Sequence, residues 1–308
     1  MNNLFKWLVM ALPLAATSQH TIAQTISEKP TIILGVCNQD SLQKKPFSSW
    51  FNPAFDHYNP DKKITDLLLK EKMDKIRIRV FFGSWCGDSK RELPRFLKLM
   101  QTISFPEKNM EIVGLGGSDS LYKQSPGHEE AGLGIFRVPV FIIYRDGKEI
   151  NRINEFPVVS LEKDLLYIIL NKNYQPNYGS HSLIRQWLQE GTLTDDNTSI
   201  RGLAEQLRHR LSGEHELNSL GYLLLNHEKK AAALQIFRMN YLLFPESANT
   251  NSSLGEGFYE TGNHVRAVEF LEKSLALNKD PQAIKPVLEL LYKIKEKEIV
   301  RRETKAVQ

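Results

Sequence analysis

The chain has 308 residues, of which 41% are hydrophobic and 25% charged, and this balance excludes a disordered or fibrous protein. Its 40 basic and 36 acidic residues leave a formal net charge of +4, which indicates no large positive field for nucleic acid. The two cysteines, Cys37 and Cys86, are too few for a disulfide scaffold and too far apart for a local metal knuckle.

The first 23 residues have the layout of a secretory signal peptide. Lys6 precedes an apolar run from Trp7 to Ala16, and a polar tail ends at Ala23. The run is shorter than the roughly 20 apolar residues of a spanning helix. We therefore expect cleavage near Ala23 rather than a retained anchor, and a periplasmic or secreted mature chain without a membrane span. Disulfide chemistry is allowed in such a compartment.

Residues 24–59 are predicted to be an N-terminal extension, and residues 60–173 an α/β domain with a mixed sheet flanked by helices. The extension contains a strand over 31–36 and an aromatic-rich loop over 46–61 that covers one edge of the core. The expected order then is a helix over 64–72 capped by Asp61, a strand over 75–82, a helix over 86–104, a strand over 111–115, a long loop to 132, strands over 138–144 and 149–153, and a helix over 161–171.

Residues 174–182 have a linker composition, and residues 183–308 are predicted to be all helical. Three pairs of positions recur 34 residues apart, namely Gly221 and Gly255, Ala233 and Ala267, and Phe237 and Leu271. This period resembles tetratricopeptide repeats, each a helix pair, at about 214–247 and 248–281. Helices over 183–188, 200–211 and 283–294 are expected to flank or cap them, and the charged tail over 293–305 to be a solvated helix.

A sequence of five residues at the end of the strand over 75–82 carries the most specific signal. It reads Trp85-Cys86-Gly87-Asp88-Ser89 and resembles the active-site motif of thioredoxin-like domains. Three further positions agree with that family: Pro94 lies eight residues after Cys86, Val138-Pro139 matches its cis-proline dipeptide, and Gly147 lies eight residues after Pro139.

The resemblance implies thiol–disulfide exchange with Cys86 as the nucleophile and without a cofactor. The eight histidines show no two-His helical spacing with an acid, so no metal site is expected. The resemblance also implies that a polypeptide substrate lies against a wall formed by Trp85, Gly87, Asp88, Val138 and Pro139. Two positions depart from the family pattern. Ser89 replaces the resolving cysteine, and Val80 replaces the buried acid on the preceding strand. A serine hydroxyl can donate a hydrogen bond to the Cys86 thiolate but cannot form a disulfide.

Three interpretations therefore remain open. In the first, Cys86 is a monothiol that forms mixed disulfides with protein partners, supported by Ser89. In the second, Cys37 is the resolving or structural disulfide partner of Cys86. In the third, the site is redox-inactive, and the domain and the repeats form a binding or assembly module. In each case the helical repeats are expected to hold a protein partner, and whether the protein is an enzyme is left undecided.

Overall fold

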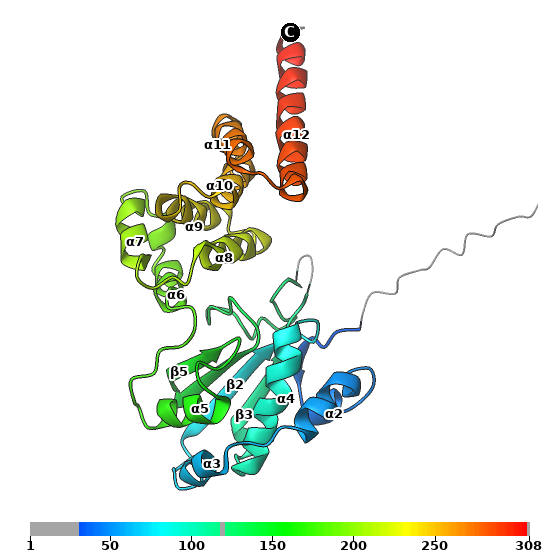
Figure 1. The fold of residues 1–308 in the computed structure, drawn as a ribbon, viewed down its shortest axis with the longest axis vertical. Coiled ribbons are helices and arrows are strands. Elements are labelled where there is room, and N and C mark those ends of the chain that lie inside the picture. The colour runs from blue at the N-terminus through cyan, green and yellow to red at the C-terminus, as the bar shows by residue number, and fades with distance from the viewer. Residues whose placement is uncertain (1–30, 118–120, 307–308) are drawn as a thin grey trace, which may run out of the picture. The chain divides into compact units, whose positions relative to one another are not determined.

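The computed structural model of the chain describes residues 31–117 and 121–306. The predicted signal peptide, residues 1–23, and its cleavage near Ala23 lie outside the described residues. The described chain contains a mixed five-stranded sheet with flanking helices, followed by a helical region (Figure 1). The predicted α/β domain followed by helices is confirmed at this level. None of the helices in the described part has the length and apolar character that a membrane crossing requires.

The sheet has the strand order β1-β3-β2-β4-β5. Its strands are β1 (Gly35–Cys37), β2 (Ile76–Phe82), β3 (Met110–Gly114), β4 (Val140–Arg145) and β5 (Lys148–Asn154). Strands β2 and β3 are parallel, and the other neighbouring pairs are antiparallel. Val80 at the centre of β2 lies opposite Ile112 on β3 and Phe141 on β4.

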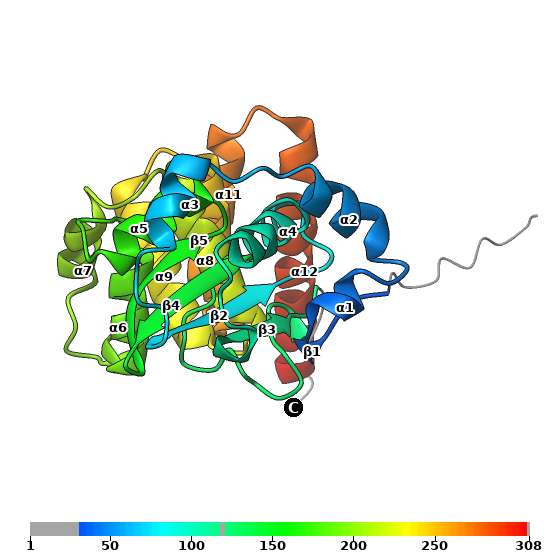
Figure 2. The ribbon, with the colours of Figure 1, turned by 90° about the horizontal axis from the view of Figure 1, so that it is seen from below.

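Five helices accompany the sheet. They are α1 (Gln39–Leu42), α2 (Ser48–Asp56), α3 (Lys62–Leu68), α4 (Gly87–Thr102) and α5 (Leu161–Ile169), with a short 3-10 turn over Glu107–Asn109. The side chain of Asp61 accepts the Lys63 N–H at 2.8 Å and so caps α3 as predicted. In Figure 2, α4 lies between β2 and α2, and α2 packs against α4.

Two predicted elements in the N-terminal extension were wrong. The strand expected over 31–36 forms only at Gly35–Cys37, and the segment over 46–61, expected to be a loop, contains helix α2. Phe51 and Phe55 are four residues apart, so a helix places both on one face, where their rings stack at 5.5 Å and are buried. The Asn and Pro residues of this segment obscured that helical spacing in the sequence.

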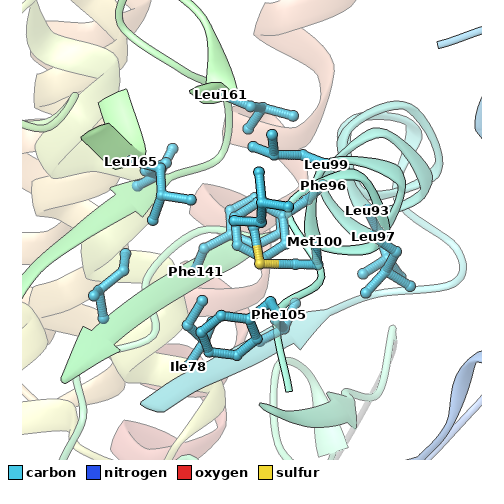
Figure 3. Packing of buried hydrophobic residues seen from close by; sticks show 14 of the residues in the cluster. Ile78, Leu93, Phe96, Leu97, Leu99, Met100, Phe105, Phe141, Leu161 and Leu165 are labelled. Carbon is cyan, nitrogen blue, oxygen red and sulfur yellow. The ribbon is translucent and has the colours of Figure 1, made fainter. Parts of the chain in front are cut away.

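One face of the sheet and the helices α2 to α5 enclose the main hydrophobic core (Figure 3). On β2, Ile76, Ile78, Val80 and Phe82 all point into it, as the alternation of side chains along a strand requires. At its centre the rings of Phe96 on α4 and Phe141 on β4 stack at 4.1 Å. The opposite face bears Phe81, Val113 and Val140, which pack against residues of the irregular segment between β3 and β4.

Seven helices form the C-terminal region: α6 (His181–Gln189), α7 (Ile200–Leu207), α8 (Glu214–Asn226), α9 (Lys230–Leu243), α10 (Ala248–Glu260), α11 (His264–Leu277) and α12 (Pro281–Ala306), with a 3-10 turn over Thr192–Thr194. The pairs α8–α9 and α10–α11 fall within the two predicted repeats. A Cβ on Gly221 would lie 2.3 Å from Phe237, and one on Gly255 would lie 2.8 Å from Leu271. The 34-residue period therefore marks the same close helix contact twice.

The described residues from Ile32 onward belong to one compact unit. The linker was predicted over 174–182. Residues 174–180 have no regular structure, whereas α6 already begins at His181. Tyr174 is buried, and its hydroxyl donates to Asp164 at 3.0 Å. This segment therefore packs on the α/β part before α6 begins. The division into two domains and the tetratricopeptide resemblance stay predictions.

Candidate functional site

Cys86 lies between the end of β2 and the start of α4, as the sequence predicts. Its backbone is extended and it occupies the N-cap position of α4, where its carbonyl accepts the Lys90 N–H at 3.0 Å. The side chain is half-buried. Its sulfur lies 3.4 Å from the carbonyl oxygen of Val138, a distance at which the thiol can donate a weak hydrogen bond.

The residues opposite Cys86 are those that the resemblance assigns to the substrate wall. The Val138–Pro139 peptide bond is cis, as predicted from the sequence. Val138 is buried with Phe81 and Val140, and Cys86 packs against the same cluster. The carbonyl of Pro139 accepts the Glu155 N–H at 2.7 Å, so the wall is tied to the segment that follows β5.

Ser89 does not have the contact that the sequence predicts. It is fully buried, and its hydroxyl oxygen accepts the backbone N–H of Gly83 at 3.1 Å. Among the hydrogen bonds of the described residues, none joins Ser89 to Cys86. The structure therefore gives Ser89 a role in closing the turn between β2 and α4, because it pairs a backbone donor that would otherwise be buried without a partner.

The next two predicted wall residues lie on the first turn of α4. Gly87 is exposed, and a Cβ built on it meets nothing within 4 Å, so the space beside Cys86 is open on this side. Asp88 forms an ion pair with Arg91 at 2.7 Å. Its charge is therefore partly balanced within the helix.

Trp85 is partly exposed and packs against the same cluster as Cys86, while its role as a substrate wall stays a prediction. Its indole N–H donates to the carbonyl of Leu115 at 3.0 Å. A Cβ on either Gly83 or Gly117 would lie 2.6 Å from the indole ring, so both positions need the absence of a side chain. The residues after 115 were predicted to form a long loop, and this contact with Trp85 was missed.

Tyr122 and three charged residues beside the site were also missed. The Tyr122 ring lies 5.7 Å from that of Trp85. Lys123 is buried and donates to the carbonyl of Phe136 at 2.8 Å. Arg137 lies 3.7 Å from Glu155. Three of these residues come from the irregular segment between β3 and β4, and Glu155 directly follows β5. No sequence periodicity signals a common location for them.

Burial shifts the pKa values of Lys123 and Glu155. It lowers the pKa of the Lys123 ammonium to about 8; Arg137 lowers it further, whereas Glu155 and the Cys86 thiolate act in the opposite direction. Burial likewise raises the pKa of the Glu155 carboxyl, and the cation of Arg137 opposes that shift. At neutral pH, Lys123 is therefore mostly protonated.

The structure does not bring Cys37 to Cys86, and both thiols are free. Cys37 lies opposite Ile112 on β3, and β2, which leads to Cys86, is the strand beyond β3. Because β3 lies between them, β1 and β2 are roughly 10 Å apart. The Cα atoms of a disulfide are only about 4.4–6.8 Å apart. Burial raises the pKa of the Cys37 thiol to about 12.

Within the described ranges, no group of three or more His, Cys, Asp or Glu side chains is placed to hold a metal ion. No protein-family model matches the chain, and a search of curated proteins found no relative. The site is therefore interpreted from its own geometry.

Proposed function

We propose that the chain is an exported thioredoxin-like protein that carries out thiol–disulfide exchange on protein partners through the single cysteine Cys86. The observation that carries the proposal is the 3.4 Å approach of the Cys86 sulfur to the Val138 carbonyl, with open space beside the neighbouring Gly87. The strand order, the cysteine at the helix start and the cis Val138–Pro139 bond support the family resemblance.

The reaction has two steps, the formation of a mixed disulfide and its resolution. The Cys86 thiolate attacks one sulfur of a partner disulfide, a mixed disulfide forms, and the other partner sulfur leaves as a thiolate that takes up a proton. Because Ser89 cannot attack the mixed disulfide, the second step needs a thiol of the partner or of a small-molecule co-substrate. Attack by the partner's own thiol releases Cys86 and isomerises the partner disulfide without net oxidation or reduction.

The competing proposal is a redox-inactive binding or assembly module. The contact that favours it is that of Ser89, whose hydroxyl accepts from Gly83 and supports the turn rather than the sulfur. In this alternative, the sheet and the helices serve as a scaffold and Cys86 remains a thiol throughout.

Trapping of mixed disulfides in the host compartment tests the choice. Cells that express the wild type, Cys86→Ala or the matched control Cys37→Ala are treated with an alkylating agent and analysed on non-reducing gels. We expect partner adducts with the wild type and with Cys37→Ala, and none with Cys86→Ala. Adducts that persist in Cys86→Ala, or their absence from all three proteins, would overturn the exchange reaction. Loss of adducts in Cys37→Ala would instead assign Cys37 a redox role.

A further inference from the structure

The irregular segment between β3 and β4 connects the cysteine site with the C-terminal helices. Tyr122 lies against Trp85 on one side and packs on the hydrophobic cluster of the helical region on the other. Its carbonyl oxygen is 2.8 Å from Nε2 of His227, which follows α8. Because a carbonyl can only accept, Nε2 carries the proton of this hydrogen bond.

A second connection runs through Arg137, the residue that precedes the Val138–Pro139 wall. Its guanidinium donates to the hydroxyl of Ser219 on α8 at 2.8 Å and lies 3.7 Å from Glu155. The guanidinium carbon is also 5.0 Å from the centre of the Tyr178 ring. The chain direction at Val138 is thus fixed from the side of the helices.

Lys123 is held by the same region. Its ammonium donates to the carbonyl of Phe136, and the Phe136 ring belongs to the cluster formed by the helices and lies edge-on to His181 at 5.0 Å. The neighbouring residue Ile135 packs instead with the cluster that contains Cys86. Adjacent side chains of the segment therefore face the helices and the cysteine site in turn.

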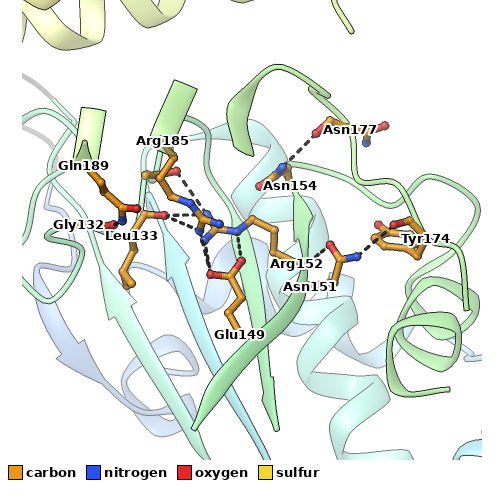
Figure 4. A network of polar contacts seen from close by, with 11 residues as sticks. Gly132, Leu133, Glu149, Asn151, Arg152, Asn154, Tyr174, Asn177, Arg185 and Gln189 are labelled. Atoms are coloured by element: carbon orange, nitrogen blue, oxygen red, sulfur yellow. Dashed lines mark hydrogen bonds and ion pairs between the residues drawn. The ribbon is translucent and has the colours of Figure 1, made fainter. Parts of the chain in front are cut away.

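Helix α6 fixes the middle of the segment (Figure 4). Arg185 on α6 pairs with Glu149 on β5 at 2.8 Å, and Glu149 also binds the buried Arg152 at 2.7 Å. Gln189 donates to the carbonyl of Gly132 at 2.9 Å. These contacts limit the freedom of the segment between Lys123 and Arg137 to move away from the sheet.

We propose that the helical region is a working part of the cysteine site, in which Ser219 and His227 hold Arg137 and Tyr122 as positioning residues for Cys86. Arg137 then fixes the next residue, Val138, whose carbonyl contacts the sulfur. Tyr122 fixes Lys123, which follows it in the chain, and Trp85, whose ring lies beside its own. The interpretation rests on the proposed thiol chemistry of Cys86, because positioning matters only for a sulfur that reacts.

The experiment uses the full chain with Cys37→Ala, so that Cys86 is its only thiol. The Ser219→Ala/His227→Ala double variant removes both contacts, whereas Ser219→Thr/His227→Gln keeps a hydroxyl and an amide donor at these positions. Substitution of the exposed Glu205 and Arg208 pair on α7 by alanine is the matched control. The rate of Cys86 alkylation is measured from pH 6 to 9, and Trp85 emission is taken as the difference from each protein's Trp85→Phe form.

We expect the double alanine variant to react at least about threefold more slowly at pH 7, because Lys123, which follows Tyr122, and Val138, which follows Arg137, are no longer held in place around the sulfur. Its Trp85 emission is expected to shift to longer wavelength. The Thr/Gln variant is expected to restore both properties, and the control to leave both unchanged. Unfolding curves for each variant ensure that folded proteins are compared.

Trapping of partners with the same variants separates this proposal from the exchange reaction. If the double variant alkylates at the wild-type rate with unchanged Trp85 emission, while the wild type still traps partners, the positioning role is wrong and the exchange reaction stands. If alkylation falls and recovers as expected but no variant traps a partner, the positioning role stands and the exchange reaction falls.

Discussion

The two faces of the sheet differ in what covers them. The face that bears Val80 and Phe141 is closed by helices α2 to α5, and its buried residues come largely from regular elements. The face that bears Phe81 and Val113 is covered by the segment between β3 and β4, and its cluster includes Trp85 and Cys86. Because side chains alternate along a strand, neighbouring residues of β2 point to opposite faces of the sheet.

Because of this difference, the two faces are suited to different roles, one to a stable core and the other to a site. Helices bury a continuous apolar stripe and satisfy their own backbone hydrogen bonds, so they suit a core. An irregular segment leaves side chains such as Lys123 and Arg137 available for contacts that do not repeat along the chain. Changes on the helix-covered face are therefore expected to alter the free energy of unfolding, and changes on the opposite face to alter Cys86 and Trp85.

The largest effect is expected for Phe141→Ala on the helix-covered face. The ring is fully buried and stacks on Phe96 at 4.1 Å, so its removal should cost about 3–5 kcal/mol of unfolding free energy. Urea unfolding followed by circular dichroism measures this loss. Val36→Ala on the exposed edge strand is the control and should change the value by less than about 0.5 kcal/mol. A loss below about 1.5 kcal/mol for Phe141→Ala would show that this face does not hold the main core.

A smaller effect is expected for the histidine buried between the helices and the segment that covers the second face. Burial lowers the pKa of His181 to about 3, with Arg137, Arg152 and Lys123 acting in the same direction. The unfolded chain takes up this proton below about pH 6.5 and the folded chain only near pH 3, so stability is lost as pH falls through this window. Between pH 7 and pH 5 the histidine should account for about 2 kcal/mol.

Urea unfolding at the two pH values, for the wild type and for His181→Phe, measures this contribution. The variant keeps an aromatic ring beside Tyr178 but cannot titrate, so its stability should fall less between pH 7 and pH 5 than that of the wild type. The exposed His57→Gln variant is the control and should follow the wild type. Equal pH dependence of the wild type and His181→Phe would contradict the prediction.

Gly117→Ala tests the close approach of Trp85 on the second face. The new Cβ would lie 2.6 Å from the indole, so the ring must move, at a cost of about 1 kcal/mol because Trp85 is partly exposed and can shift. Trp85 emission and urea unfolding report the two effects. Gly87→Ala, whose Cβ meets nothing within 4 Å, should change neither. In a Trp85→Ala background the cost of Gly117→Ala should disappear, and full additivity would argue against the contact.

The two thiols should differ in reactivity with little effect on stability. Burial raises the pKa of Cys37 to about 12, so this thiol stays protonated in the folded chain at pH 8. Mass spectrometry of peptides after brief alkylation at pH 8 should therefore show modification of Cys86 before Cys37. Both thiols should react in urea. Equal rates in the folded protein would mean that Cys37 is more open than its position on β1 indicates.

The sequence alone predicted the elements that rest on local patterns. Alternating apolar residues located β2, Asp61 marked the start of α3, and the 34-residue period located the helix pairs around Gly221 and Gly255. Cys86 was placed correctly at the strand-to-helix junction because that junction depends on residues that are adjacent in the sequence. The helix over Ser48–Asp56 was missed because Asn and Pro residues interrupt its apolar spacing.

Only the tertiary structure decided which groups meet at Cys86. Tyr122, Lys123 and Arg137 lie in a segment without periodicity, and Ser219 and His227 are 133 and 141 positions from Cys86 in the chain, so no local rule places them together. The partner of Ser89 was likewise set by the turn that returns Gly83 to the helix start. Local propensity fixes elements over a few residues, whereas a site depends on how distant elements pack.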